Sequence, residues 1–162
     1  VILLPEIPYD IDKVYKAIDK RTKDNKGFTI VAVAEGAIPK EIAELPKKKR
    51  KEAIANNPYP SVAYELADKL KAYATQDIRI AIPGHTQRGG SPCPYDRVLA
   101  TRLGAAAADL ILKEDYGYMV GIKNGNIRKV PLGEVAGKLK MVDPKADIIK
   151  EAKIVGISFG DE

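Results

Sequence analysis

The sequence has 162 residues, of which 45% are hydrophobic and 30% are charged, and its formal net charge is +5. These proportions are typical of a folded globular protein and exclude the disordered, collagen-like and disulfide-rich classes, because Cys93 is the only cysteine. No apolar run approaches the roughly 20 residues of a membrane-spanning helix. We therefore expect one domain, 1–162, with no membrane partner and with a cytoplasmic location.

The first part of the chain predicts two strands with a helix between them. The apolar run 1–4 predicts a short strand. Asp10 is in position to cap a helix from residue 11 to about residue 22, in which apolar residues recur at helical spacing. The β-branched run 29–34 predicts a strand buried on both faces, as in a parallel sheet, and Glu35 follows this strand directly.

Residues 38–60 are rich in lysine, proline and asparagine, which predicts a surface insertion with short helices near 40–45 and 51–55. The five consecutive basic residues 47–51 carry a summed charge of +5, which equals the net charge of the whole sequence. No aromatic residue interrupts this run, so it lacks a platform on which nucleic-acid bases could stack. We expect a solvated segment and no nucleic-acid partner, with nucleic-acid binding through these residues as the alternative.

The remaining sequence continues the alternation of helices and strands. The elements expected after residue 60 are a helix capped by Ser61, a short strand over 78–82, a helix over 94–112, a hairpin of strands 118–123 and 126–130, and a helix over 131–139. Such an order predicts an α/β fold with three layers, α/β/α, a mainly parallel sheet and an antiparallel edge hairpin.

Four polar residues are candidates for a binding site. Ligands of open α/β sheets sit beyond the carboxyl ends of the strands, which selects Glu35 and the segment 84–90. Within this segment, His85 and Arg88 lie three residues apart on a glycine-flanked loop, and an arginine fork suits phosphate or carboxylate. Arg79, inside an apolar strand, needs an anionic partner if it is buried. The alternative is a structural loop with ordinary surface ion pairs.

The segment 84–92, with the sequence GHTQRGGSP, is followed by Tyr95-Asp96-Arg97. Together they closely resemble the GHxQRGGSPxxYDR signature of the 6-phosphofructokinases. Further segments that resemble this family in the right order are 5–9, 33–36, 99–104 and 120–122. On these motifs the chain is identified as the carboxyl-terminal, sugar-phosphate-binding part of a 6-phosphofructokinase, with 38–60 as a surface insertion.

This resemblance implies transfer of a phosphoryl group to the 1-hydroxyl of fructose 6-phosphate, in glycolysis, with Mg²⁺ and ATP or pyrophosphate. ATP is favoured here only because it is the commoner donor. Carried over to this sequence, His85 and Arg88 bind the 6-phosphate and Glu35 binds a sugar hydroxyl. Arg79 reaches the phosphate of a neighbouring subunit in a homo-oligomer.

The family's glycine-rich donor loop and its catalytic base have no counterpart in this sequence. We therefore expect ATP or pyrophosphate and Mg²⁺ to be bound by a missing amino-terminal part, and the chain alone to be inactive, with no catalytic, cofactor-binding or metal-binding residue. A stand-alone sugar-phosphate binding or regulatory module is the alternative. Allosteric control stays open, because Lys26 matches a lysine of the family's effector site whereas Asp24 does not. Cys93 is expected to be packed.

Overall fold

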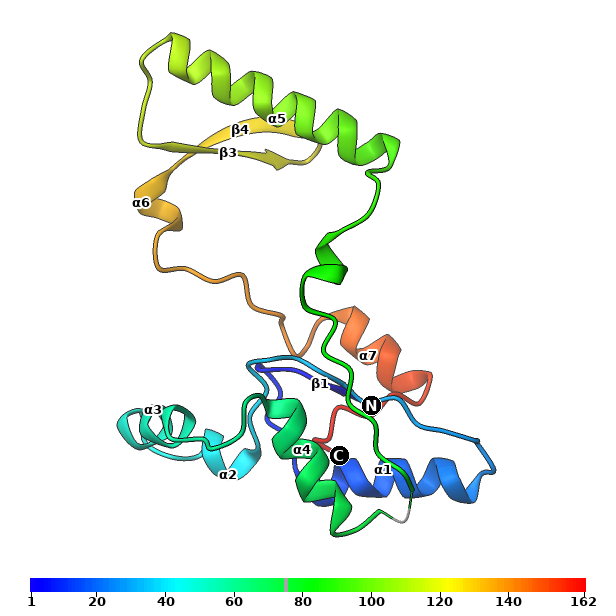
Figure 1. The fold of residues 1–162 in the computed structure, drawn as a ribbon. Coiled ribbons are helices and arrows are strands. Elements are labelled where there is room, and N and C mark those ends of the chain that lie inside the picture. The colour runs from blue at the N-terminus through cyan, green and yellow to red at the C-terminus, as the bar shows by residue number, and fades with distance from the viewer. Residues whose placement is uncertain (75) are drawn as a thin grey trace. The chain divides into compact units, whose positions relative to one another are not determined.

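The structure is a computed structural model that describes residues 1–74 and 76–162. The chain forms two compact units: unit 1 comprises residues 1–81 and 141–162, and unit 2 comprises residues 82–140. Figure 1 labels most of the helices and strands of both units. Among the described residues, no helix combines the length and the hydrophobicity that a bilayer crossing requires.

Unit 1 is built from short strands and helices. Its elements in chain order are β1 (Ile2–Leu3), α1 (Ile11–Lys23), β2 (Ala32–Val33), α2 (Lys40–Ala43), α3 (Lys47–Ala55), α4 (Val62–Lys71) and α7 (Asp147–Ile154). Strands β1 and β2 pair in parallel, with Leu3 opposite Val33. The Ala34 amide donates to the Leu3 carbonyl over 3.0 Å and so continues the pairing to the residue before Glu35. The expected parallel pairing is confirmed.

Helix α1 begins where the sequence predicts. The Asp10 carboxylate accepts a hydrogen bond from the Asp12 amide over 2.9 Å, which satisfies one of the free amides of the first turn. Three basic residues occupy the last turn, where the helix dipole favours positive charge. The apolar face of the helix is anchored by Val14, which is fully buried.

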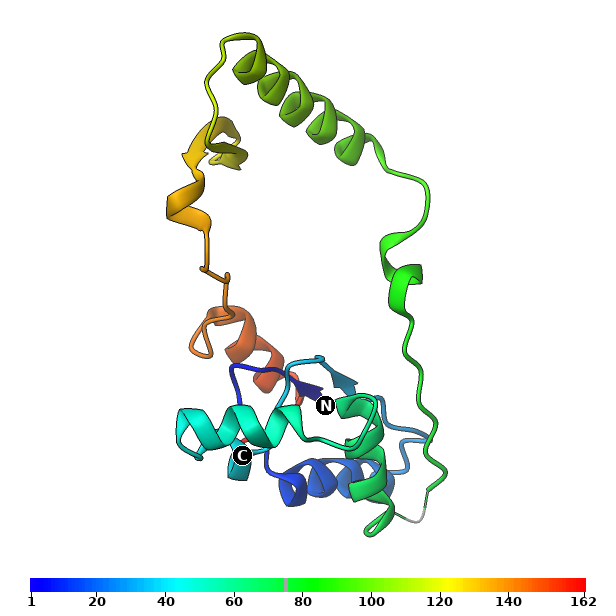
Figure 2. The ribbon, with the colours of Figure 1, turned by 60° about the vertical axis from the view of Figure 1, so that its left-hand side comes forward.

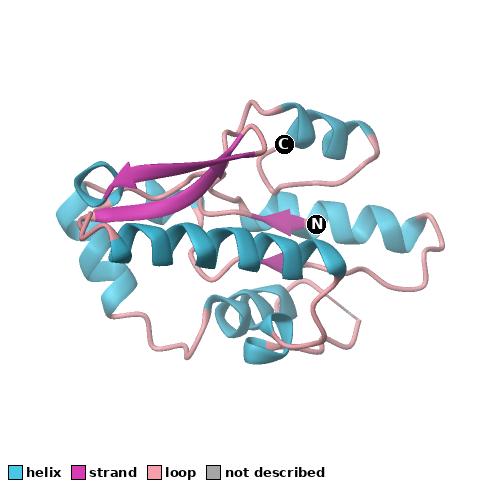
Figure 3. Cartoon of the chain, turned by 90° about the horizontal axis from the view of Figure 1, so that it is seen from above, coloured by secondary structure: helices cyan, strands magenta, loops and turns pink. Residues whose placement is uncertain are grey.

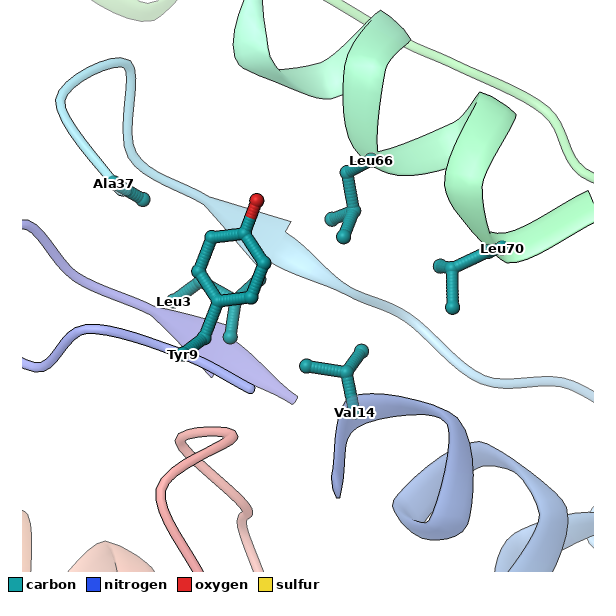
Figure 4. Close-up of a cluster of buried hydrophobic side chains, with 6 residues drawn as sticks. All are labelled: Leu3, Tyr9, Val14, Ala37, Leu66 and Leu70. Atoms are coloured by element: carbon teal, nitrogen blue, oxygen red, sulfur yellow. The ribbon is translucent and has the colours of Figure 1, made fainter. Parts of the chain in front are cut away.

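One hydrophobic cluster holds unit 1 together (Figure 4). Its members come from strand β1, from helices α1 and α4 and from two connecting segments, and each is at most 5% exposed: Leu3, Tyr9, Val14, Ala37, Leu66 and Leu70. Burial of a large apolar side chain stabilises the folded state by roughly 1.5–3 kcal/mol compared with leaving it exposed. Since Leu3 lies opposite Val33 in the β1–β2 pair, this cluster also fixes the end of β2 from which Glu35 emerges.

The carboxyl-terminal segment of unit 1 returns to its first strand. A second cluster of buried residues contains Ile7, Ile149 of α7 and Phe159. The Ile2 amide donates to the Ser158 carbonyl over 2.9 Å. At the start of α1, the Asp10 amide donates to the Gly160 carbonyl over 2.8 Å.

Unit 2 consists of a long helix and a hairpin. Its elements are the 3₁₀ helix η1 (Gly84–Arg88), α5 (Pro94–Leu112), β3 (Tyr118–Lys123), β4 (Asn126–Pro131) and α6 (Leu132–Val135). The predicted turn at Asn124-Gly125 is confirmed, with φ of 52° and 76°, the left-handed values that a two-residue hairpin turn of type I′ requires. Helix α5 contacts both strands of the hairpin, and Figure 3 shows the hairpin as the two long arrows beside it.

Four expectations about local structure were wrong. The run 29–34 forms a strand only at Ala32–Val33, and this strand is not buried on both faces, because Ala32 is exposed. The segment 78–82 is not a strand, because no neighbouring strand among the described residues pairs with it. The helix expected over 131–139 ends at Val135, since Ala136 leaves the helical region and Gly137 has a φ of +72°. Ser61 precedes α4, but its side chain makes no capping hydrogen bond and its hydroxyl is buried without a partner among the described residues.

The insertion 38–60 holds the two expected short helices, α2 and α3. Helix α3 begins at Lys47, so the basic run lies on helix α3 and not in an irregular loop. No residue of α3 is buried. Exposed lysines on a helix are solvated side chains, as the sequence predicts for this segment.

Candidate functional site

The loop 83–92 is shaped by glycines and by one threonine. Figure 2 shows η1 as a single helical turn within this loop. Thr86 closes the turn, because both its hydroxyl and its amide donate to the carbonyl of Pro83. Gly84 and Gly90, at the two ends, have φ of +51° and +112°, in the region that side chains with a Cβ rarely adopt. The backbone therefore requires glycine at Gly84 and Gly90, whereas Gly89, with a φ of −94°, has an ordinary extended conformation.

His85 and Arg88 lie on the same face of this turn. A 3₁₀ helix has three residues per turn, so side chains at positions i and i+3 lie one above the other. Both residues are exposed. Among the described residues, neither side chain is in an ion pair or a hydrogen bond with a carboxylate. An imidazole and a guanidinium on one face can donate together to a single anionic group.

Arg79 lies in an extended segment of unit 1 and not in the strand that the sequence predicts. Its side chain is 91% exposed, so the requirement for a buried anionic partner does not apply. Its Nε atom lies 3.3 Å from Oδ2 of Asp77, which is itself 80% exposed. An exposed pair of this kind contributes little stability, so the guanidinium is available to another anion.

Glu35 lies in the turn that follows β2. The Ala37 amide donates to the Ala34 carbonyl over 2.9 Å and closes this turn around Glu35 and Gly36. A Cβ atom at Gly36 would lie 3.2 Å from the ring of Pro5, so the chain passes close to Pro5 here. Glu35 is exposed, and its carboxylate can accept hydrogen bonds from hydroxyl groups.

The four predicted residues fall into two pairs. His85 and Arg88 share one turn of unit 2, whereas Glu35 and Arg79 belong to unit 1. Within unit 1, Glu35 follows β2. Arg79 follows Ile78, which packs against the main hydrophobic cluster. The local geometry therefore brings together the histidine and the arginine of the motif.

A shallow cavity of about 280 Å³ in unit 1 contains none of these four residues. Its charged lining residues are of both signs: Asp10, Lys13, Lys40, Glu44 and Asp161. Because its cations lie among carboxylates, this cavity is poorly suited to an anionic ligand. No group of three or more histidine, cysteine, aspartate or glutamate side chains within residues 1–74 and 76–162 is arranged to hold a metal ion.

Sequence reasoning missed the residues that anchor the loop to α5. Cys93, expected to be packed, is exposed and is the N-cap residue of this helix. Its backbone amide donates to Oδ2 of Asp96 over 2.9 Å. The spacing of three residues between an N-cap and an acidic side chain is the signal of a capping box, but cysteine is not among the usual N-cap residues.

A family model described as phosphofructokinase matches residues 1–111. An ATP-dependent 6-phosphofructokinase of Spirochaeta thermophila is 44% identical over 161 residues, which are 99% of this chain and 44% of that enzyme. The enzyme of the same name from Chloroflexus aurantiacus is 39% identical over 100% of this chain and 44% of its own length. A pyrophosphate–fructose 6-phosphate 1-phosphotransferase of Amycolatopsis methanolica is 38% identical over 90% of this chain and 42% of its own length.

The structure is similar to that of phosphofructokinase from Saccharomyces cerevisiae, with a TM-score of 0.54 and 26% sequence identity. The match covers 82% of this chain and 16% of the yeast chain, and it confirms the expected α/β fold. The chain spans about 44% of the length of the two ATP-dependent relatives. Because the family model covers more than half of the residues, the chain belongs to the phosphofructokinase family.

Proposed function

We propose that this chain is the fructose 6-phosphate-binding part of an ATP-dependent 6-phosphofructokinase, and that the loop 83–92 binds the 6-phosphate. The observation that carries the proposal is the placement of His85 and Arg88 on one face of η1. A sugar phosphate carries a charge between about −1.5 and −2 at pH 7. Two exposed cation donors one turn apart match the several oxygens of such a group.

The backbone of the loop supports this role. Glycines at both ends keep bulky side chains away from the approach to η1, and no heavy atom lies within 4 Å of where a Cβ would stand at Gly84 or Gly90. The guanidinium of Arg88 can donate two parallel hydrogen bonds to two phosphate oxygens. His85 supplies a donor from its ring, and a second when it is protonated.

Glu35 and Arg79 complete the proposed sugar site. Glu35 is exposed at the end of a parallel strand, where it accepts hydrogen bonds from a sugar hydroxyl. Arg79 extends into solvent, and Asp77 is its one ion-pair partner among the described residues, which suits a residue that reaches the phosphate bound by a neighbouring subunit of a homo-oligomer. In this scheme each phosphate is bound by two arginine side chains and one histidine side chain.

The donor and the metal ion are bound outside this chain in the proposed enzyme. The two relatives with the highest identity quoted above are named as ATP-dependent, which favours ATP, and the Amycolatopsis methanolica relative is named for pyrophosphate. A kinase positions its donor, its metal ion and its attacking hydroxyl together. Because we assign the base, donor and Mg²⁺ sites to an amino-terminal part, we expect this cytoplasmic chain to be inactive alone.

A titration of the chain with fructose 6-phosphate, followed by calorimetry or by amide chemical shifts, tests the proposal. Arg88→Ala should raise the dissociation constant about 10- to 150-fold, the loss expected when hydrogen bonds to a charged group are removed. Arg128→Ala is the matched control, because Arg128 is an exposed arginine on β4 of the same unit and lies outside the loop. Equal affinities of the wild type and the Arg88→Ala variant would contradict the proposal.

A further inference from the structure

The first turn of α5 holds the segment that leads out of the loop 83–92. Oδ2 of Asp96 accepts the Cys93 amide over 2.9 Å, and the Arg97 amide donates to the Cys93 carbonyl over 3.2 Å. The Nε atom of Arg97 donates to the Pro92 carbonyl over 3.4 Å. Three hydrogen bonds therefore tie residues 92 and 93 to the start of the longest helix of unit 2.

The loop depends on this anchor at its carboxyl side. Its amino side is closed by the bonds from Thr86 to Pro83. Between Arg88 and Pro92 the chain passes through Gly89 and Gly90, and glycine restricts the backbone less than any other residue. On the carboxyl side of these glycines, Pro92 and Cys93 are the nearest residues that hydrogen bonds hold to α5.

The carboxylate of Asp96 is well suited to hold this fixed point. Hydrogen bonds from the side chain of Cys93 and then from its backbone amide lower the pKa of Asp96, so the group stays ionised at neutral pH. The amino end of α5, which spans 19 residues, also favours a negative charge in its first turn. An ionised Asp96 thus keeps its hydrogen bond throughout the pH range in which a sugar phosphate is dianionic.

We infer that Asp96 is a positioning residue, which fixes Cys93 at the start of α5 and thereby holds the His85–Arg88 face in the orientation that binds phosphate. This inference rests on the proposed function of the loop. Asp96 itself does not contact the ligand, and its contribution passes through the backbone from residue 93 to residue 88. Its removal should weaken phosphate binding while the two cations remain present.

The test compares dissociation constants for fructose 6-phosphate among variants of the full chain. Asp96→Ala should raise the constant at least about threefold and at most about 30-fold, the upper bound being the whole stability of a helix cap. Asp96→Asn keeps an acceptor oxygen at the same position and should remain within about twofold of the wild type. Faster hydrogen exchange of the Cys93 amide in Asp96→Ala, and not in Asp96→Asn, would show that the affinity follows this hydrogen bond.

Asp109→Ala is the control for the stability of α5. Asp109 forms an exposed ion pair of 2.6 Å with Lys113 at the other end of this helix, far along the sequence from the loop. We expect its affinity to equal that of the wild type, with circular dichroism to show that both alanine variants remain helical. A loss in Asp109→Ala equal to that in Asp96→Ala would overturn the inference.

The Arg88→Ala variant distinguishes failure of the positioning role of Asp96 from failure of the proposed phosphate site. If Arg88→Ala weakens binding and Asp96→Ala does not, the positioning role is overturned and the proposed function stands. If Arg88→Ala binds as tightly as the wild type, or the wild type does not bind, the phosphate site and the positioning role are both overturned.

Discussion

Substitution of Gly160 by alanine should destabilise unit 1 because this residue packs directly on the main hydrophobic cluster. Its φ is +72°, and an added Cβ would lie 2.9 Å from Cβ of Tyr9, 2.9 Å from Cγ2 of Val14 and 3.2 Å from Cδ2 of Leu3. These three neighbours are fully buried, so they cannot move into solvent. The left-handed backbone costs roughly 1–2 kcal/mol, and overpacking costs typically about 1–3 kcal/mol.

We therefore expect Gly160→Ala to lower the free energy of unfolding by about 2–5 kcal/mol, a large part of the roughly 5–15 kcal/mol of a typical domain. Urea denaturation followed by far-ultraviolet circular dichroism measures this change. Gly156→Ala is the matched control, because Gly156 has a φ of +87° and no atom within 4 Å of an added Cβ. In the control, the free energy of unfolding should fall only by the cost of the left-handed backbone, roughly 1–2 kcal/mol. Equal losses in the two variants would refute the steric argument.

Three further predictions concern stability. Gly104→Ala in α5, where no atom lies within 4 Å of an added Cβ, should raise the free energy of unfolding by about 0.5–1 kcal/mol in urea denaturation. Tyr9→Phe should leave this free energy unchanged or higher, because the buried Tyr9 hydroxyl has no hydrogen-bond partner among the described residues; a loss above about 1 kcal/mol would contradict this. Hydrogen bonds to Asp161 and then Glu162 raise the pKa of Lys153. Their stabilisation is therefore complete below the ordinary lysine pKa of 10.5 and is lost as the pH rises through the raised value. Lys153→Met should reduce the alkaline fall of the urea midpoint, because this contribution is then absent at every pH.

The elements that the sequence predicts well are those whose signals are local. Helix α1 has a capping aspartate at Asp10 and an apolar face of its own, so its start does not depend on distant residues. The hairpin turn at Asn124-Gly125 is specified by two residues that tolerate a positive φ. Helix α5 begins at Pro94, the first helical position, where proline fits best.

The wrong expectations concern structure that depends on partners. The apolar alternation of 78–82 is compatible with a strand, but a strand forms only where another strand supplies hydrogen bonds. Arg79 therefore lies outside any strand, and its exposed side chain does not need the anionic partner that a buried arginine would require. The helix after Pro131 is shorter than the sequence predicts. Gly133 and Gly137 weaken it, as glycine does in helix interiors.

The candidate site could be predicted in part. The motif identifies His85 and Arg88, and the 3₁₀ turn explains why a spacing of three places them on one face. The role inferred for Asp96 could not be read from residue types, because it depends on the hydrogen bond to the Cys93 amide.

The central claim is that this chain supplies the sugar-phosphate site of a phosphofructokinase, and an active chimera tests it most directly. The amino-terminal part of the Spirochaeta thermophila enzyme, fused to this chain, provides the donor site that we assign to that part. In this chimera Arg88→Ala should raise the KM for fructose 6-phosphate about 10- to 150-fold and leave the KM for ATP unchanged. Equal changes in the two KM values, or no change in either, would contradict the account.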